Sequence, residues 1–170
     1  MITLSSVGWA TYAADFRGAE FMVSLLSSET MIETPQNIEP ENHIKLEVDD
    51  IAFEIKGRTC PNRGHIQKLL HFGKTIDEFS EVVVHCAMGR SRSPAALITL
   101  LAQRNPDMEQ EIVNLVYEEA PHIQPNLLLI ELADTELGCK GKLINAVEAL
   151  PVHWEENFDD FVTFSYAIPS

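Results

Sequence analysis

The sequence has few cysteines, few basic residues and no long apolar run, and each shortage excludes a class of protein. Its three cysteines form no C-x-x-C pair, which argues against a disulfide framework and against a zinc site. No apolar run approaches the length of a membrane span, and residues 1–7 lack the basic start and long apolar stretch of a signal peptide. We therefore expect a cytoplasmic protein that needs no metal and no other cofactor and makes no stable membrane association.

Positive charge is scarce, since 12 Lys and Arg stand against 26 Asp and Glu for a formal net charge of -14. A surface of this charge repels nucleic acid and anionic lipid head groups, so we expect no nucleic-acid partner. The basic residues gather in the middle third of the chain, where they either hold an anion or balance nearby carboxylates. They include Lys56, Arg58, Arg63, Lys68, Lys74, Arg90 and Arg92.

What the chain does contain is 45% apolar residues over 170 positions, enough for one ordered domain with a full core. We assign residues 1–150 to this domain. Residues 151–170 mix acidic with aromatic side chains and form a C-terminal extension. This extension is expected to pack loosely, the alternatives being that it docks on the domain, on a neighbouring chain or on a partner. The sequence favours no particular oligomeric state.

Short apolar runs alternate with helical patterns along the chain. The predicted strands are residues 1–7, 21–26, 43–48 and 82–84. Residues 8–19 are predicted to be a loop with at most one helical turn. The predicted helices are residues 62–79, 93–103, 125–138 and 141–150, together with a helix that begins at residue 105. This alternation predicts an α/β fold with a central, mostly parallel sheet of four to five strands and helices on both faces.

The stretch that carries chemistry joins the fourth predicted strand to the following helix and reads HCAMGRSRS over residues 85–93. Ligands in an α/β fold lie beyond the carboxyl ends of the strands, where Cys86 is placed. Backbone N–H groups of a tight loop can converge on one anion, the helix adds its positive end, and Arg92 offers a planar fork for two phosphate oxygens. The same positive potential favours the thiolate of Cys86, a nucleophile aimed at phosphorus.

The other residues of this stretch have supporting roles in the prediction. Gly89 permits the backbone geometry of the loop, and the hydroxyls of Ser91 and Ser93 can hydrogen-bond the sulfur. His85 is expected to fix the loop through side-chain hydrogen bonds. Taken singly, a buried cysteine is usually inert and an arginine at a helix start usually faces solvent, so only the combination is informative. The predicted phosphate-binding residues are Ala87, Met88, Gly89, Arg90, Ser91 and Arg92.

Residues 85–93 resemble the H-C-x5-R-S signature of the cysteine-dependent protein phosphatases, the tyrosine and dual-specificity group. Met88 departs from the alanine that small dual-specificity members often carry, which would make the rim bulkier. The likeness is clearest over residues 44–103, and the whole chain more loosely resembles small bacterial tyrosine-phosphatase-like proteins. It implies a phosphatase-like fold, and hydrolysis of a phosphorylated protein or small phosphate ester through a cysteinyl-phosphate intermediate. Pro125 and Asn126 resemble the family's C-terminal helices and are interpreted as packing residues.

Thiolate attack expels an alkoxide or phenolate, so a proton donor is required. The resemblance implies an aspartate on a loop upstream of the cysteine, and the third predicted strand ends in Asp49-Asp50. Asp50 matches the family position best, Asp49 is the alternative, and the other carboxylate is expected to cap a turn. Repulsion between adjacent carboxylates favours a proton on at least one of them.

Two other functions share parts of this pattern. A phosphate-recognising binding module would keep the cradle without turnover, although the intact pair of Cys86 and Arg92 argues against it. A sulfurtransferase of the rhodanese type also has a cysteine at a strand end in an anion-binding loop. Rhodanese loops generally place the arginine one position nearer the cysteine and lack the His-Cys start, so the spacing favours a phosphatase.

Overall fold

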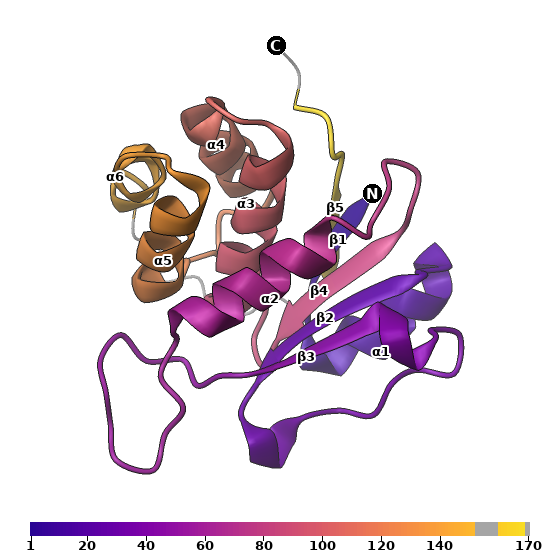
Figure 1. Ribbon diagram of the computed structural model, residues 1–170. Coiled ribbons are helices and arrows are strands. Elements are labelled where there is room, and N and C mark those ends of the chain that lie inside the picture. The colour runs from indigo at the N-terminus through magenta and orange to yellow at the C-terminus, as the bar shows by residue number, and fades with distance from the viewer. Residues whose placement is uncertain (152–159, 169–170) are drawn as a thin grey trace.

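The computed structural model describes residues 1–151 and 160–168 and forms an α/β structure (Figure 1). Its strands are β1 (Ile2–Ser6), β2 (Phe21–Leu26), β3 (His43–Glu47), β4 (Val82–Cys86) and β5 (Phe161–Phe164). Its α-helices are α1 (Val7–Arg17), α2 (Arg63–Gly73), α3 (Arg92–Arg104), α4 (Glu109–Glu119), α5 (Leu127–Leu137) and α6 (Lys142–Glu148). Within these described ranges, no helix combines the length and apolar character needed to cross a bilayer.

The strands form one five-stranded sheet in the order β3-β2-β4-β1-β5. Neighbouring strands are parallel, except that β5 runs antiparallel to β1. The central strand β4 is buried on both faces, which explains why its residues read as an unbroken apolar run in the sequence. The predicted α/β class with a mostly parallel sheet of four to five strands is confirmed.

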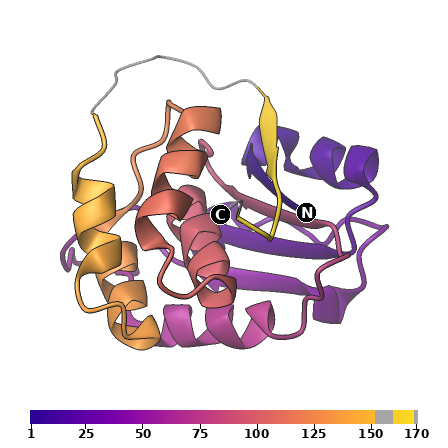
Figure 2. The same ribbon diagram turned by 90° about the horizontal axis from the view of Figure 1, so that it is seen from above.

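Helices cover both faces of the sheet, as predicted, but unequally (Figure 2). On one face, Ala10, Ala13 and Ala14 of α1 pack with Met22 and Val83 of the sheet. The other face packs against α2 and α3, and together they enclose the larger core. Helices α4 and α5 pack against α3, and α6 packs against both of them. The carboxyl ends of β1, β2, β3 and β4 therefore open on one edge between these two layers.

Helix α1 corrects the prediction of a loop at residues 8–19. Its buried side consists of small alanines, while its outer side carries Trp9, Tyr12 and Phe16, all exposed. A helix that is apolar on both sides shows no amphipathic period, and this hides it from pattern analysis. Gly18, with a left-handed φ of 62°, ends the helix.

The other helices are predicted correctly in type but differ at their ends. Asn62 caps α2 as expected, because its side chain accepts a hydrogen bond from the first turn of the helix. Helix α2 ends at Gly73 rather than near Phe79, and α4 begins at Glu109 rather than at Asn105. Helix ends depend on local hydrogen bonds that apolar spacing does not report.

Residues 161–168 do not form the loosely packed extension that the sequence analysis expected. Strand β5 pairs with the edge of β1, and Thr163 Oγ1 lies 2.9 Å from Thr3 Oγ1. A strand of 4 residues whose partner lies at the other end of the chain leaves little signal in the sequence. The rest of the predicted extension, residues 152–159 and 169–170, lies outside the described part of the chain.

Candidate active site

The loop after β4 is held tightly against the end of β1. Cys86 is the last residue of β4 and is only 1% exposed. The Val7 N–H donates a hydrogen bond to the Ala87 carbonyl at 3.4 Å. Gly89 has a φ of 68°, and a Cβ at this position would lie 3.1 Å from the Ser5 carbonyl oxygen. Only glycine allows both this left-handed backbone and this close approach, so Gly89 sets the path of the loop.

Neighbouring segments bind the carbonyl groups of the same loop from outside. The Arg90 carbonyl accepts a hydrogen bond from Gln124 N–H at 2.8 Å, and the Ser91 carbonyl accepts one from Asn126 N–H at 3.2 Å. In a trans peptide the N–H and C=O bonds point in opposite directions. Because these two carbonyls point out of the loop, the N–H groups of the same two peptides point toward its inside. Such an arrangement suits an anion. Met88 is exposed in this loop.

The Arg92 side chain reaches from the start of α3 to the end of β3. Its Nη1 donates a hydrogen bond to the Val48 carbonyl at 2.8 Å, and its Nε lies 4.0 Å from Asp50 Oδ2. The Nε is buried and has no hydrogen-bond partner among the described residues. A buried guanidinium N–H without an acceptor is costly, so this group is well matched to an anion at the loop.

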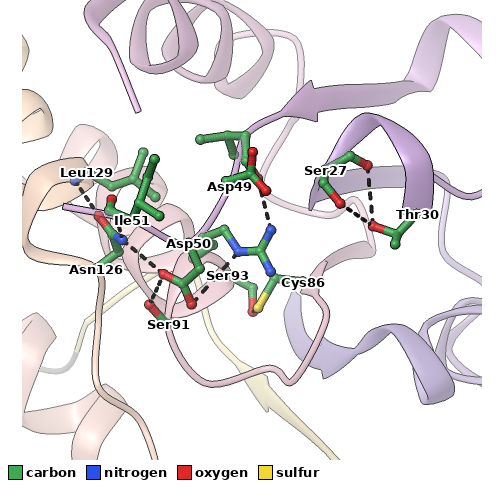
Figure 3. Close-up of polar contacts among 12 residues, drawn as sticks. Ser27, Thr30, Asp49, Asp50, Ile51, Cys86, Ser91, Ser93, Asn126 and Leu129 are labelled. Atoms are coloured by element: carbon green, nitrogen blue, oxygen red, sulfur yellow. Dashed lines mark hydrogen bonds and ion pairs between the residues drawn. The ribbon is translucent and has the colours of Figure 1, made fainter. Parts of the chain in front are cut away.

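The Cys86 sulfur accepts a hydrogen bond from the Ser93 hydroxyl at 3.1 Å (Figure 3). Ser93 thus places a hydrogen-bond donor against the atom that the sequence analysis names as the nucleophile. Ser91 differs from the prediction, because its hydroxyl donates instead to Asp50 Oδ1 at 2.6 Å. Ser93 lies in the first turn of α3, whereas Ser91 precedes the helix, and the turn between them directs the two hydroxyls to different partners.

Asp49 holds together the two ends of the loop that follows β3. Its carboxylate accepts a hydrogen bond from Thr59 N–H at 2.7 Å and an ion-paired one from Arg58 at 3.1 Å. The hydrogen bond from the Thr59 N–H lowers the pKa of Asp49 below its usual range, and Arg58 adds a smaller effect in the same direction. The predicted repulsion between the adjacent carboxylates is therefore outweighed at Asp49, which is only 8% exposed and stays ionised.

Asp50 points the other way, toward the loop that follows β4 (Figure 3). Its side chain is 41% exposed, and its Oδ1 accepts hydrogen bonds from Ser91 at 2.6 Å and from Asn126 Nδ2 at 2.9 Å. Both of these donors use Oδ1, which leaves Oδ2 on the side of Arg92. Of the two candidate carboxylates, Asp50 is the one placed beside the predicted nucleophile loop.

Asn126 is the residue of this site that the sequence analysis missed. Its Nδ2 donates to Asp50 and to the Ile51 carbonyl, while its Oδ1 accepts from Leu129 N–H at 3.1 Å. It thus caps α5 and orients the carboxylate at the same time. The sequence contains the signal for the cap, a polar residue before an apolar helix, but nothing that shows its reach to residues so far away along the chain.

His85 is fully buried on the α1 side of the sheet. Its Nε2 lies 2.6 Å from the Ser24 hydroxyl, which also lies 2.7 Å from His43 Nε2. Burial, and then the neighbouring His43, lower the pKa of His85 to about 4. Burial also lowers the pKa of His43 to about 4, with Lys45 acting in the same direction. Both imidazoles are therefore neutral near pH 7.

These histidines predict that the protein loses stability in mild acid. Between pH 6.5 and 4, the unfolded chain binds protons at His85 and His43 that the folded chain does not bind. The free energy of unfolding should therefore fall as the pH is lowered through this window, by about 3 kcal/mol for His85 alone. Urea denaturation at a series of pH values measures this, and a free energy that stays constant from pH 7 to 4.5 would contradict it.

The site combines a thiol, a hydroxyl that donates to it, a partly unpaired guanidinium and a carboxyl group around one loop. Such a set can bind a phosphate, attack it and protonate a leaving group. Across the described ranges, no group of three or more His, Cys, Asp or Glu residues is arranged to hold a metal ion.

Comparison with known proteins gives a consistent result at the level of structure. No protein-family model and no curated protein sequence matches this chain. The human tyrosine phosphatase-like serine/threonine/tyrosine-interacting protein matches with a TM-score of 0.62 and 15% identity, over 82% of this chain and 92% of that one. Human DUSP28 matches with a TM-score of 0.59 and 17% identity, over 82% and 92%. The chain has the fold of the dual-specificity phosphatases.

A third structure with this dual-specificity phosphatase fold is PTPMT1 in complex with PI(5)P, with a TM-score of 0.58, 14% identity and coverage of 81% and 90%. The predicted resemblance to the tyrosine and dual-specificity group is thus confirmed for the fold. The looser likeness to small bacterial members is not shown by these neighbours and stays a prediction.

Proposed function

We propose that the protein is a cysteine-dependent phosphatase that hydrolyses phosphate monoesters, with protein phosphotyrosine or dual-specificity sites as its substrates. The observation that carries this proposal is the Cys86 sulfur, which accepts a hydrogen bond from Ser93 at 3.1 Å inside a loop closed by Arg92. The fold supports the proposal independently, because its neighbours include dual-specificity phosphatases.

In the first step, the amide groups of residues 87–91 and the Arg92 guanidinium hold three phosphate oxygens. The Cys86 thiolate attacks phosphorus, and the bond from phosphorus to the ester oxygen breaks. Asp50 supplies the proton that the departing oxygen needs, from Oδ2. The Oδ1 atom stays bound to Ser91 and Asn126, which keeps the carboxyl group oriented during the transfer.

In the second step, water attacks the cysteinyl phosphate from the side that the leaving group vacated. Asp50, now ionised, takes a proton from this water, and the bond between sulfur and phosphorus breaks. The sulfur leaves as a thiolate, which the Ser93 hydroxyl stabilises. The products are inorganic phosphate and an alcohol or phenol, and the enzyme returns to its starting state.

Turnover of p-nitrophenyl phosphate by the purified protein in the presence of a chelator tests this proposal. We expect hydrolysis that the chelator does not reduce. Absence of hydrolysis together with vanadate binding would indicate a phosphate-recognising module instead. Transfer of sulfur from thiosulfate to Cys86 would indicate a rhodanese-type enzyme.

The proposed preference for protein substrates rests on charge. A net charge of -14 repels the many negative charges of an anionic membrane surface more strongly than the few charges of a phosphopeptide. We expect a phosphotyrosine peptide to be a better substrate than PI(5)P in vesicles. The opposite order of kcat/KM would assign the protein to the lipid phosphatases.

The two neighbouring aspartates give a matched test of the general acid. We expect Asp50→Asn to slow hydrolysis of phenyl phosphate by about a hundredfold, since an amide cannot donate the proton that a phenolate needs. The loss should be smaller with p-nitrophenyl phosphate, because nitrophenolate leaves more readily without a proton. Asp49→Asn should lower stability while changing kcat little, because Asp49 binds Thr59 and Arg58. The reverse ranking of the two variants would reassign the acid.

A further inference from the structure

Strand β3 is the outermost strand at one end of the sheet, so one of its edges has no neighbouring strand (Figure 1). Just past this strand, the Val48 N–H donates a hydrogen bond to the Leu26 carbonyl at the end of β2. The backbone groups of successive residues in a strand alternate in direction, so the N–H and carbonyl of Lys45 point away from β2. No described residue is hydrogen-bonded to either group. The edge can therefore pair with a further strand at Lys45.

A groove of about 910 Å³ lies between this edge and helix α2. Residues 41–45 line it on the side of β3. On the side of α2 it is lined by polar side chains that the helix exposes, which are Gln67, Lys68 and His71. Ile44, which is half-buried, and Phe72, which is buried, add apolar surface. None of the described residues that line the groove belongs to the candidate active site, so the proposed mechanism leaves it unexplained.

The wall of the groove that α2 forms is basic, in contrast to the rest of the chain. Residues 55–76, which include α2, contain no Asp or Glu, although the whole chain has 26. The basic residues of this segment are Lys56, Arg58, Arg63, Lys68 and Lys74. Lys45 Nζ lies 4.0 Å from Glu33 Oε2, so the positive charge of the groove rests on Lys68.

This local charge favours an acidic partner of small size. At physiological salt, charges more than about 8 Å apart are largely screened, so a short acidic segment responds mainly to the cations beside it. A second copy of this chain would instead bring a whole surface with a net charge of -14 against an equal one. The groove therefore suits an acidic peptide segment better than it suits another copy of the protein.

We propose that the groove between β3 and α2 binds an extended acidic segment of a partner protein, which adds a strand to the sheet at β3. The backbone of this segment pairs with the N–H and carbonyl of Lys45, and its carboxylates lie near Lys68. Main-chain pairing supplies affinity for any extended segment, whereas the charge of α2 selects an acidic one. The proposal concerns a surface outside the candidate active site and does not depend on the proposed function.

Titration of the full chain with a short fluorescent peptide of alternating glutamate and valine tests this proposal. We expect saturable binding that weakens as salt is raised, because valine favours an extended backbone and glutamate supplies the charge. The same peptide with lysine in place of glutamate should bind much more weakly. Absence of binding by the acidic peptide, or equal binding of the two peptides, would overturn the proposal.

Two pairs of variants separate the backbone contribution from the charge. Lys45→Pro removes the outward N–H and is compatible with an edge strand, whereas Lys45→Ala loses the same side chain and keeps the N–H. We expect Lys45→Pro to bind the acidic peptide about tenfold more weakly than Lys45→Ala does. Lys68→Glu, on the exposed side of α2, should also weaken binding about tenfold. Lys140→Glu makes the same change of charge outside the groove and should have little effect. Equal binding within either pair would refute the role of that residue and, with it, the proposal.

Amide hydrogen exchange locates the bound peptide without any substitution. In the free protein we expect the Lys45 N–H to exchange quickly and the Val48 N–H, which is bonded to Leu26, to exchange slowly. The acidic peptide should slow exchange at Lys45. Binding that leaves Lys45 unprotected, or that vanadate abolishes, would place the peptide at the loop after β4 and contradict the proposal. Protection of Lys45 that rises with protein concentration in the absence of peptide would assign the edge to a second copy of the chain instead.

Discussion

Cys86→Ser is expected to lower kcat for p-nitrophenyl phosphate by at least about a thousandfold, because a serine hydroxyl does not ionise near neutral pH. The substitution replaces sulfur by oxygen in a buried position, where Ser93 can still donate a hydrogen bond. The variant should therefore fold normally and still bind phosphate analogues in the loop. Turnover and vanadate binding, measured on the same preparation, separate loss of the nucleophile from loss of the fold.

Cys139→Ser provides the matched control for this experiment. Cys139 is also buried, but burial and the nearby Glu109 raise its pKa to about 12. It is therefore a neutral thiol at any pH where the enzyme would be assayed. The control should keep full turnover. If hydrolysis survived in Cys86→Ser and disappeared in Cys139→Ser, the assignment of the nucleophile would be wrong.

Arg92→Lys is expected to have the second largest effect, a loss of about a hundredfold or more in kcat/KM. Lysine keeps the charge, but it cannot bind the Val48 carbonyl and present two further N–H groups to phosphate oxygens in one plane. Most of the loss should fall on kcat, because the planar guanidinium matches the equatorial oxygens of the transition state better than the oxygens of the bound ester. Steady-state kinetics and a urea unfolding curve on the same variant give both quantities.

Arg104→Lys, at the other end of α3, controls for a general loss of stability. Arg104 lies over the ring of Tyr166 at 4.4 Å from its centroid and contacts no residue of the candidate site among the described contacts. The Arg104→Lys variant should lose some stability and keep the turnover of the wild type. Equal losses of kcat/KM in Arg92→Lys and Arg104→Lys would mean that Arg92 acts through the fold and not on phosphate.

The core of the candidate site was predictable because it lies in one short stretch of chain. Gly89 is needed by the turn itself, and Cys86, Ser93 and Arg92 are brought together by the change from strand to helix. The apolar run of β4 likewise shows in the sequence, since a strand buried on both faces has no polar positions. In such segments, neighbours in sequence are also neighbours in space.

Other features depend on which distant segments come together. Asp50 and Asp49 are chemically identical in the sequence, and only their partners, Asn126 with Ser91 on one side and Thr59 with Arg58 on the other, distinguish them. The same is true of β5, which exists because β1 offers an open edge. Long-range contacts of this kind leave no periodic signal along the chain.

The amino-acid order was thus sufficient for the α/β class and for placing the loop of residues 86–92, with its thiol and guanidinium, between a strand and a helix, because each shows in patterns within a few residues. The folded chain was needed to separate the two aspartates, to recruit Asn126 and to connect His85 with Ser24 and His43. Those roles arise from hydrogen bonds between strands and helices that meet only when the sheet has formed, and hydrogen bonds are specific to distance and direction rather than to sequence neighbourhood.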